Sequence, residues 1–274
     1  MDDAVKTSED LFLASFEGGY EDEAPWDAVR ALRHRNTAEV FKLASAYCRS
    51  GKPIRRARAL DVLAQLGAGP PPSDRPYLNA SVSIALAHLR EEDPLVVHSA
   101  AWALAHLRDE RAVGALIERR NDPDPDVRLA VAYGMAGPER PEATQTLIEL
   151  MEDEDEEVRN CATFGLGTTY GEDGSGRIGT VDSAEIREAL RKRLDDPFGE
   201  VRDEAVWGLA KRRDSQGLRL LVDRLEAQEW VTGDEMAAAE ALDFGYDTPI
   251  EKLLGGLRNL LSGQGSESDN HPAR

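Results

Sequence analysis

The sequence predicts an all-α protein built as an α-solenoid of about six repeats. Four segments align with one another without gaps, and their apolar residues recur at helical spacing. Each segment also follows a second amphipathic stretch that is long enough for about three helical turns. A pair of such helices cannot bury its apolar face alone. Neighbouring pairs are therefore expected to stack, with capping helices at the two ends.

The aligned segments define a common frame, in which position zero is a valine. They read DPLVVHSAAWALAHL, DPDVRLAVAYGMAG, DEEVRNCATFGLG and FGEVRDEAVWGLA, with position zero at Val96, Val127, Val158 and Val201. The spacings are 31, 31 and 43 residues, so the last interval contains an insertion. Two weaker copies, with position zero at Arg55 and Asp234, give six registers in all.

Each of the four strong copies carries one apolar stripe at frame positions zero, four and eight. At about 100° per residue these positions share one helix face, which we expect to be buried. The preceding stretches RAVGALIERR, EATQTLIELM, AEIREALRKRL and GLRLLVDRL are predicted to form the first helix of their pairs. Each unit is then a helical hairpin whose second helix carries the stripe.

An acidic residue stands six residues before the arginine that follows position zero. The pairs are Asp122 with Arg128, Asp153 with Arg159, and Asp196 with Arg202, and Glu91 keeps the acid where Val97 replaces the arginine. An aspartate in the turn can cap the next helix, while the arginine can reach a turn carboxylate of its own or of the neighbouring repeat. We interpret these pairs as structural links.

Units such as DPDPDVRLAVAYGMAG, at a 31-residue period, resemble the short HEAT-like repeats named after the phycobilisome lyases. The resemblance covers roughly 36–260 and implies a right-handed solenoid. It is specific for fold and not for function, because such repeats serve lyases, hydroxylases and adaptors. The phrases ATFGLG and EIREALRKRLDDP are also similar to a group of bacterial HEAT-repeat proteins of uncharacterised function.

Three segments are expected along the chain. Residues 1–24 form an acidic flexible segment with a possible short helix at LFLASF, residues 25–261 the solenoid, and residues 262–274 a disordered tail. Capping helices are predicted over 25–34 and 249–261, because both stretches have an apolar side.

The net charge indicates which partners are expected, and the start of the sequence and the cysteines indicate the compartment. The 33 basic and 52 acidic residues give a net charge of -19, which argues against nucleic acid and anionic membranes as partners and favours a soluble monomer. The sequence begins without a signal peptide and contains no membrane span, so a cytoplasmic protein is predicted. Cys48 and Cys161 form no CxxC pair and are expected to be reduced structural thiols.

The sequence gives little support to catalysis. HEAT-repeat hydroxylases hold two irons with His-Glu pairs, and the chain has no such dipeptide. It has no GxSxG elbow, and the glycine-rich insertion TYGEDGSGRIGTVDS lacks the GK[ST] of a phosphate-binding loop, so it is predicted to be a flexible loop. HEAT-like DNA glycosylases need a basic groove, which the acidic balance opposes. We expect no cofactor and no metal.

The side of the second helices opposite the stripe is the candidate binding surface, which in HEAT arrays lines the concave face. Frame position six lies there, and an aromatic residue occupies it in four successive repeats. This aromatic series consists of Trp102, Tyr133, Phe164 and Trp207. Polar residues flank the series one turn away, among them His98, His106, Asn160, Thr168, Asp203 and Lys211.

Two interpretations of the aromatic series remain open at this stage. The rings could cover the small residues of their own and adjacent helices, as packing elements. Alternatively, they form an exposed apolar surface that anchors a partner. On the second interpretation the chain is a non-catalytic scaffold or adaptor that binds a protein or peptide segment. The alternative function is a lyase-like HEAT protein that cradles a tetrapyrrole or another aromatic ligand.

Overall fold

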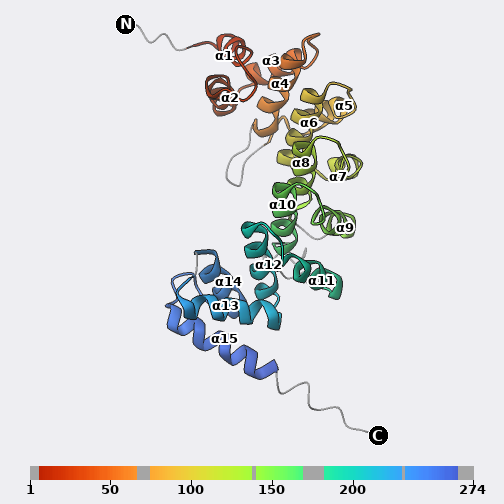
Figure 1. The fold of residues 1–274 in the computed structure, drawn as a ribbon. Coiled ribbons are helices and arrows are strands. Elements are labelled where there is room, and N and C mark those ends of the chain that lie inside the picture. The colour runs from red at the N-terminus through yellow and green to blue at the C-terminus, as the bar shows by residue number, and fades with distance from the viewer. Residues whose placement is uncertain (1–5, 67–74, 138–139, 169–181, 230–231, 265–274) are drawn as a thin grey trace. The chain divides into compact units, whose positions relative to one another are not determined.

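The computed structural model describes residues 6–66, 75–137, 140–168, 182–229 and 232–264. Within these ranges the chain forms fifteen α-helices and no strand (Figure 1). The chain divides into two compact units, residues 1–134 and 135–274. No helix of the described ranges combines the length and the apolar character needed to cross a membrane.

The first unit contains an N-terminal hairpin followed by three helix pairs. Its helices are α1 (Ser8–Ser15), α2 (Glu23–Arg35), α3 (Ala38–Tyr47), α4 (Pro53–Gln65), α5 (Leu78–His88), α6 (Pro94–Leu107), α7 (Glu110–Ile117) and α8 (Pro125–Met135), whose last residue lies at the unit boundary. Helices α4 and α6 pack directly on each other, as second helices of successive repeats.

The second unit contains three helix pairs and a final helix. Its helices are α9 (Pro141–Leu150), α10 (Glu156–Gly167), α11 (Ala184–Arg193), α12 (Gly199–Lys211), α13 (Ser215–Ala227), α14 (Thr232–Leu242) and α15 (Ile250–Gln264). Helix α12 packs on both α10 and α14, so the second helices form the inner layer of this unit too.

The predicted frame coincides with the second helices. The six registers fall on α4, α6, α8, α10, α12 and α14. In the four strong copies, every residue at positions zero, four and eight is exposed by 1% or less. These residues are Val96, Ala100, Leu104, Val127, Val131, Met135, Val158, Ala162, Leu166, Val201, Ala205 and Leu209. The periodicity therefore predicted the buried stripe correctly.

Aspartates in the turns set where second helices begin. The Asp155 carboxylate accepts hydrogen bonds from the backbone N–H groups of Glu157 and Val158, at 3.0 and 3.1 Å. Asp93 caps α6 in the same way through Val96 N–H. These bonds satisfy backbone donors that have no partner within the helix, so these two turns specify the first residues of α6 and α10.

Two glycines allow neighbouring helices of the second unit to approach closely. A Cβ atom on Gly208 would lie 3.1 Å from the Cα atom of Gly167, where α12 crosses α10. A Cβ atom on Gly217 would lie 2.5 Å from Leu209 Cβ and 2.8 Å from Ala210 N. At Gly217 a side chain has no room, so the packing of α13 on α12 depends on glycine there.

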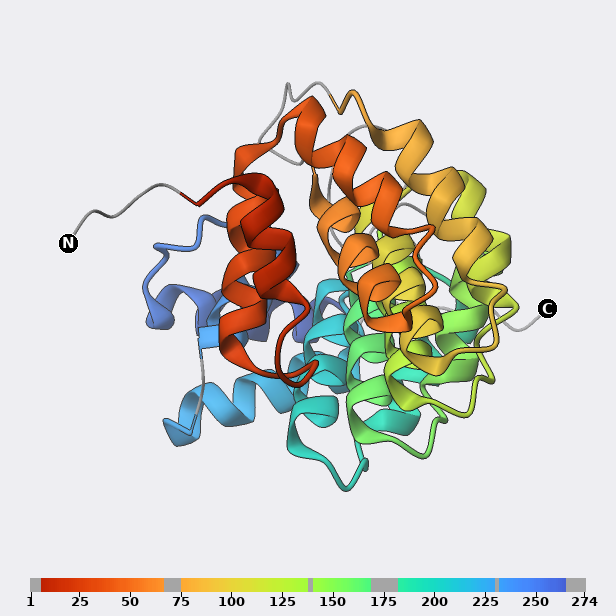
Figure 2. The ribbon, with the colours of Figure 1, turned by 90° about the horizontal axis from the view of Figure 1, so that it is seen from above.

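The N-terminal hairpin packs against the first repeat. Helix α1 includes most of the expected LFLASF helix, and its Leu11 and Phe12 are buried. Helix α2, which corresponds to the cap predicted over 25–34, contacts α1 and α4 (Figures 1 and 2). The described part of the segment expected to be flexible, from residue 6 onwards, therefore has a packed core of its own.

The C-terminal cap continues slightly beyond the predicted helix. Helix α15 ends at Gln264, so the helix includes the first residues of the segment that we expected to be a disordered tail. Residues 265–274 of that tail, and residues 169–181 of the glycine-rich insertion, lie outside the described residues.

Candidate functional site

Each predicted pair of acid and arginine is bonded within the turn of its own repeat. In each pair, the arginine donates from its terminal nitrogen to the backbone carbonyl of the acidic residue, not to its carboxylate. The distances are 2.9 Å for Arg128 and Asp122, 2.9 Å for Arg159 and Asp153, and 2.7 Å for Arg202 and Asp196. The carboxylate of each acid instead accepts from the backbone N–H two residues later, at 3.0 to 3.1 Å. Of the two predicted alternatives for the arginine, these contacts are therefore not the bond to its own turn carboxylate.

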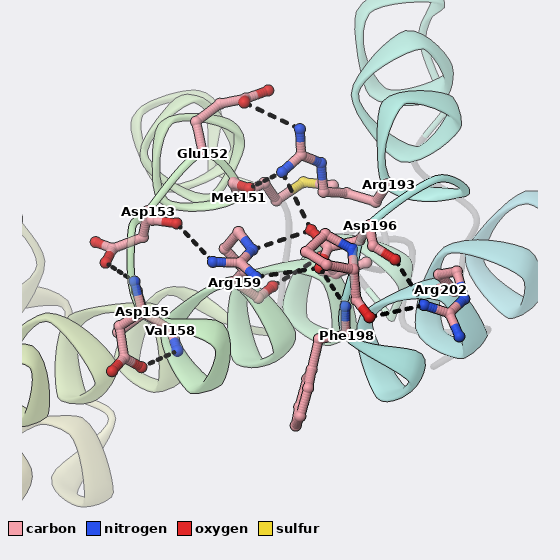
Figure 3. A network of polar contacts seen from close by, with 12 residues as sticks. Met151, Glu152, Asp153, Asp155, Val158, Arg159, Arg193, Asp196, Phe198 and Arg202 are labelled. Carbon is pink, nitrogen blue, oxygen red and sulfur yellow. Dashed lines mark hydrogen bonds and ion pairs between the residues drawn. The ribbon is translucent and has the colours of Figure 1, made fainter.

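The predicted contact with the neighbouring repeat is present in the second unit (Figure 3). Arg159 of α10 donates from Nε and from a terminal nitrogen to the two carboxylate oxygens of Asp196, at 2.9 and 3.1 Å. Arg193 also approaches this carboxylate, at 3.4 Å. Burial raises the pKa of Asp196, but the hydrogen bonds from Arg159 and from the backbone of Phe198 hold it below its ordinary value.

The first unit contains the same link at a position that sequence reasoning missed. Arg56 donates to the carbonyl of Ser50, six residues earlier, at 2.8 Å. It also pairs with the carboxylate of Glu91 in the next repeat, at 2.9 Å. Arg56 follows frame position zero of the weak copy at Arg55, so the frame itself could have identified it as the partner of Glu91.

In the first unit, two members of the aromatic series form a cluster with His106. The ring centroids of Trp102 and Tyr133 lie 5.7 Å apart. The His106 centroid lies 5.8 Å from that of Trp102 and 5.2 Å from that of Tyr133. The guanidinium of Arg108 lies 5.2 Å from the Tyr133 centroid. Both aromatic residues are half-buried. Burial and the neighbouring arginines lower the pKa of His106, which favours a neutral imidazole in this cluster.

His98, the other predicted flanking histidine, contacts the N-terminal hairpin. Its ring lies edge-on to that of Tyr20, with the centroids 5.7 Å apart. Its Nδ1 lies 4.0 Å from the carboxylate of Asp126. His98 and His106 thus belong to different clusters of the first unit.

Tyr20 contacts α4 at frame position six. In this weak copy the position holds Asp61 and not an aromatic residue. The Tyr20 hydroxyl donates to the carboxylate of Asp61 at 3.0 Å, and lies 2.9 Å from Ser99 Oγ. The Arg58 guanidinium, which is fully buried, lies 4.3 Å from the Tyr20 ring and 4.6 Å from the Trp26 ring. Sequence reasoning did not assign Tyr20, because its segment lies outside the repeats.

Asp61 and Arg58 form a buried polar group beneath Tyr20. Their nearest side-chain atoms are 3.6 Å apart, and Arg33 donates to the backbone carbonyl of Asp61 at 2.9 and 2.7 Å. Burial raises the pKa of Asp61 to about 6, although the surrounding donors and arginines oppose the shift. The N-terminal hairpin is therefore attached to the first repeat through charged and aromatic contacts.

In the second unit, the two members of the aromatic series have different environments. Phe164 of α10 is 47% exposed. Trp207 of α12 is half-buried, donates from Nε1 to the Asp234 carboxylate at 2.9 Å, and lies against Gly233. Trp207 is therefore a packing residue between α12 and α14, whereas the Phe164 ring is exposed.

The polar residues that flank these two rings also differ. Asp203 pairs with Arg224 at 2.8 Å, and Lys211 with Glu240 at 3.1 Å. Asn160 is half-buried, and its Oδ1 atom is buried without a hydrogen-bond donor among the described residues. Thr168 donates to the backbone carbonyl of Phe164, as part of the end of α10. Of these four flanking residues, Asn160 is thus the one with a buried acceptor that has no partner among the described residues.

Comparisons with known proteins identify the repeats. Residues 114–175 match the family described as HEAT repeats, and residues 96–122 match the PBS lyase HEAT-like repeat. The chain therefore contains HEAT repeats of the type that its sequence resembles, in an all-helical α-solenoid. No curated protein matches the sequence.

Solved structures of similar fold cover nearly the whole chain. The Escherichia coli protein YibA is 20% identical, with a TM-score of 0.62, over 96% of this chain and 99% of its own. The Cnd3–Cnd2 condensin subcomplex of S. pombe is 15% identical, with a TM-score of 0.59, over 97% of this chain and 39% of its own. A HEAT-like repeat protein of Thermococcus onnurineus is 14% identical, with a TM-score of 0.50, over 93% and 98%. At these identities the likeness concerns the fold alone.

Proposed function

We propose that the chain is a non-catalytic scaffold that binds a protein or peptide segment on the surface of its second helices. The observation that carries this proposal is Phe164, a large apolar side chain that is 47% exposed at a frame position where the other strong repeats also hold aromatic residues. Exposed aromatic residues on a rigid helical surface are frequent anchors of protein interfaces.

Each unit offers a candidate surface of its own on its second helices. In the second unit Phe164 is the anchor, with Asn160 beside it, while Trp207 and Asp203 support the helices from within. In the first unit the half-buried cluster of Trp102, Tyr133 and His106 offers ring faces and edges. An enclosed tetrapyrrole site is not favoured, because Phe164, the most exposed ring of the aromatic series, has no facing aromatic among the described residues.

Site-specific photocrosslinking in the source cell tests the proposal, because it captures a bound protein whatever its identity. A benzophenone amino acid is placed at Phe164 in one variant and at Trp102 in another. The control position is Tyr246, which is 64% exposed and lies in the turn between α14 and α15. We expect a discrete protein adduct from Phe164 and from Trp102 but not from Tyr246. Equal adducts at all three positions, or adducts at Tyr246 alone, would contradict a second-helix binding surface.

A further inference from the structure

Helix α10, which carries Phe164, and the neighbouring helix α12 both carry acidic side chains. Glu157 and Glu200, both at the frame position just before zero, are exposed, and Glu204 at position three of α12 is half-buried. Their side chains form no ion pair or hydrogen bond with the residues that the structure describes. In contrast, the nearby basic residues Lys211 and Arg224 already pair with acids. These three carboxylates of α10 and α12 are therefore unpaired within the described residues, and Glu157 lies two helical turns before Phe164 on the same face of α10.

Cys161 of α10 shows that one carboxylate of α10 and one of α12 lie in the same region. Burial raises the pKa of the Cys161 thiol to about 12, and Glu157 of α10 and Glu204 of α12 both add to the shift. Since α10 and α12 pack on each other, these residues lie on adjoining faces of neighbouring helices. Asn160, next to Cys161 in the sequence, contributes the buried Oδ1 atom that lacks a donor within the described ranges.

Glu204 in particular forms no ion pair with the residues that the structure describes. Burial raises its pKa to about 7, and Asp203 adds to this effect, whereas Lys211 opposes it. A half-buried carboxylate in this state binds a proton near neutral pH because its desolvation is not compensated by a close positive charge. A positively charged group placed against Glu204 would stabilise the ionised form.

We propose that the α10–α12 surface, defined by Phe164, Asn160, Glu157, Glu200 and Glu204, binds a basic protein segment through an arginine side chain. This inference rests on the proposed scaffold function and specifies the chemistry of its partner. An arginine offers a planar guanidinium that can stack on the ring of Phe164 while its five N–H donors reach carboxylate and amide oxygens. The net charge of -19 favours approach of a basic segment at long range.

The test uses the full chain and three synthetic peptides of about a dozen residues each. Every second position is arginine in the first peptide, glutamine in the second and glutamate in the third. The remaining positions hold the same apolar residues in all three. Affinity is measured by fluorescence anisotropy at low and moderate salt. We expect the arginine peptide to bind at least about tenfold more tightly than the glutamine peptide. The glutamate peptide is expected not to bind.

Matched variants separate a local site from the overall charge. The site variant combines Glu157→Gln, Glu200→Gln and Glu204→Gln. The control combines Glu142→Gln, Glu185→Gln and Glu188→Gln, three exposed residues on α9 and α11 that change the net charge equally. We expect at least about a tenfold loss for the site variant, a similar loss for Phe164→Ala, and less than about a twofold change for the control. Circular dichroism confirms that each variant is folded.

The outcomes distinguish this inference from the scaffold proposal. Equal losses in the site and control variants would show that bulk charge attracts the peptide, which overturns the inference. Tight binding of the glutamine peptide that depends on Phe164 but not on the glutamates would also overturn it, while supporting the scaffold function. Failure of every peptide to bind, together with negative crosslinking at Phe164, would contradict both.

Discussion

Arg159 and Asp196 join two consecutive repeats through a two-point contact. The arginine lies on α10, and the aspartate lies in the turn before α12, 37 residues later. The Arg159 side chain is 11% exposed and that of Asp196 is 2% exposed, so the pair is largely protected from water. The same arginine also holds the carbonyl of Asp153 in its own turn. One side chain thus fixes the positions of two successive turns.

Arg159→Lys should destabilise the protein by about 1 to 3 kcal/mol, because lysine cannot reproduce two parallel bonds to a buried carboxylate. Thermal unfolding of the variant measures this loss. Arg258→Lys is the control, since Arg258 and Glu226 are 60% and 44% exposed and such a pair contributes roughly 0 to 1 kcal/mol. Equal melting temperatures for the two variants would contradict a structural role for the Arg159 link.

Gly217→Ala should destabilise the second unit by about 1 to 3 kcal/mol, because the added methyl group would overlap Leu209 and the backbone of Ala210. The matched change Gly255→Ala lies within α15, where a Cβ atom would meet nothing within 4 Å. That variant should gain roughly 0.5 to 1 kcal/mol from reduced backbone freedom in the unfolded chain. Chemical denaturation compares the two, and a stabilised Gly217→Ala variant would show that the packing of α13 on α12 is looser than described.

Asp61→Asn should change the pH dependence of stability. The pKa of Asp61 is raised from 3.8 to about 6 in the folded chain. The stabilisation that protonation provides is therefore complete below pH 3.8 and is lost as the pH rises through about 6. The stability of Asp61→Asn minus that of the unsubstituted protein should therefore be more favourable at about pH 7.5 than at about pH 4.5. Melting curves at the two pH values test this, and a pH-independent difference would rule out protonation of Asp61 as the cause.

Phe164→Ala and Trp207→Ala should separate binding from packing. Loss of Trp207 removes the Nε1 bond to Asp234 and leaves space beside Gly233, so a cost of about 3 to 5 kcal/mol is expected. Loss of the exposed Phe164 ring should change stability by less than about 1 kcal/mol. Melting temperatures decide this comparison. A large stability loss in Phe164→Ala would assign that ring to the core and remove the anchor of the proposed surface.

The helical stripe and the repeat links could be predicted from sequence because they recur. Val158 and Leu166 are fully buried, as the frame required, and Arg159 contacts the next repeat as one of the two predicted alternatives. The repetition did not reveal that Trp207 is held by Asp234, since this contact joins residues of unlike registers. For the same reason the repeat frame assigned Phe164 and Trp207 to the same position and the same predicted role, although their environments differ.

The contact between Tyr20 and Asp61 could not be predicted from the repeat pattern. Tyr20 belongs to a segment without internal copies, and its partner is a buried acid at a position where the strong repeats hold aromatic residues. The sequence indicated only that the aromatic series ends at Asp61. Tertiary contacts decide what occupies such a position, and local periodicity carries no information about them.

The link from a repeat's arginine to the next repeat's turn has a consequence for the ancestry of the chain. Arg56 with Glu91, and Arg159 with Asp196, use the same two frame positions, one on each side of a junction. A gene duplication or deletion that removes or adds one whole unit recreates this complementary junction wherever both positions are kept. The link therefore allows the number of repeats to vary during evolution. An insertion between two successive turns, such as the one between Arg159 and Asp196, also leaves the junction intact.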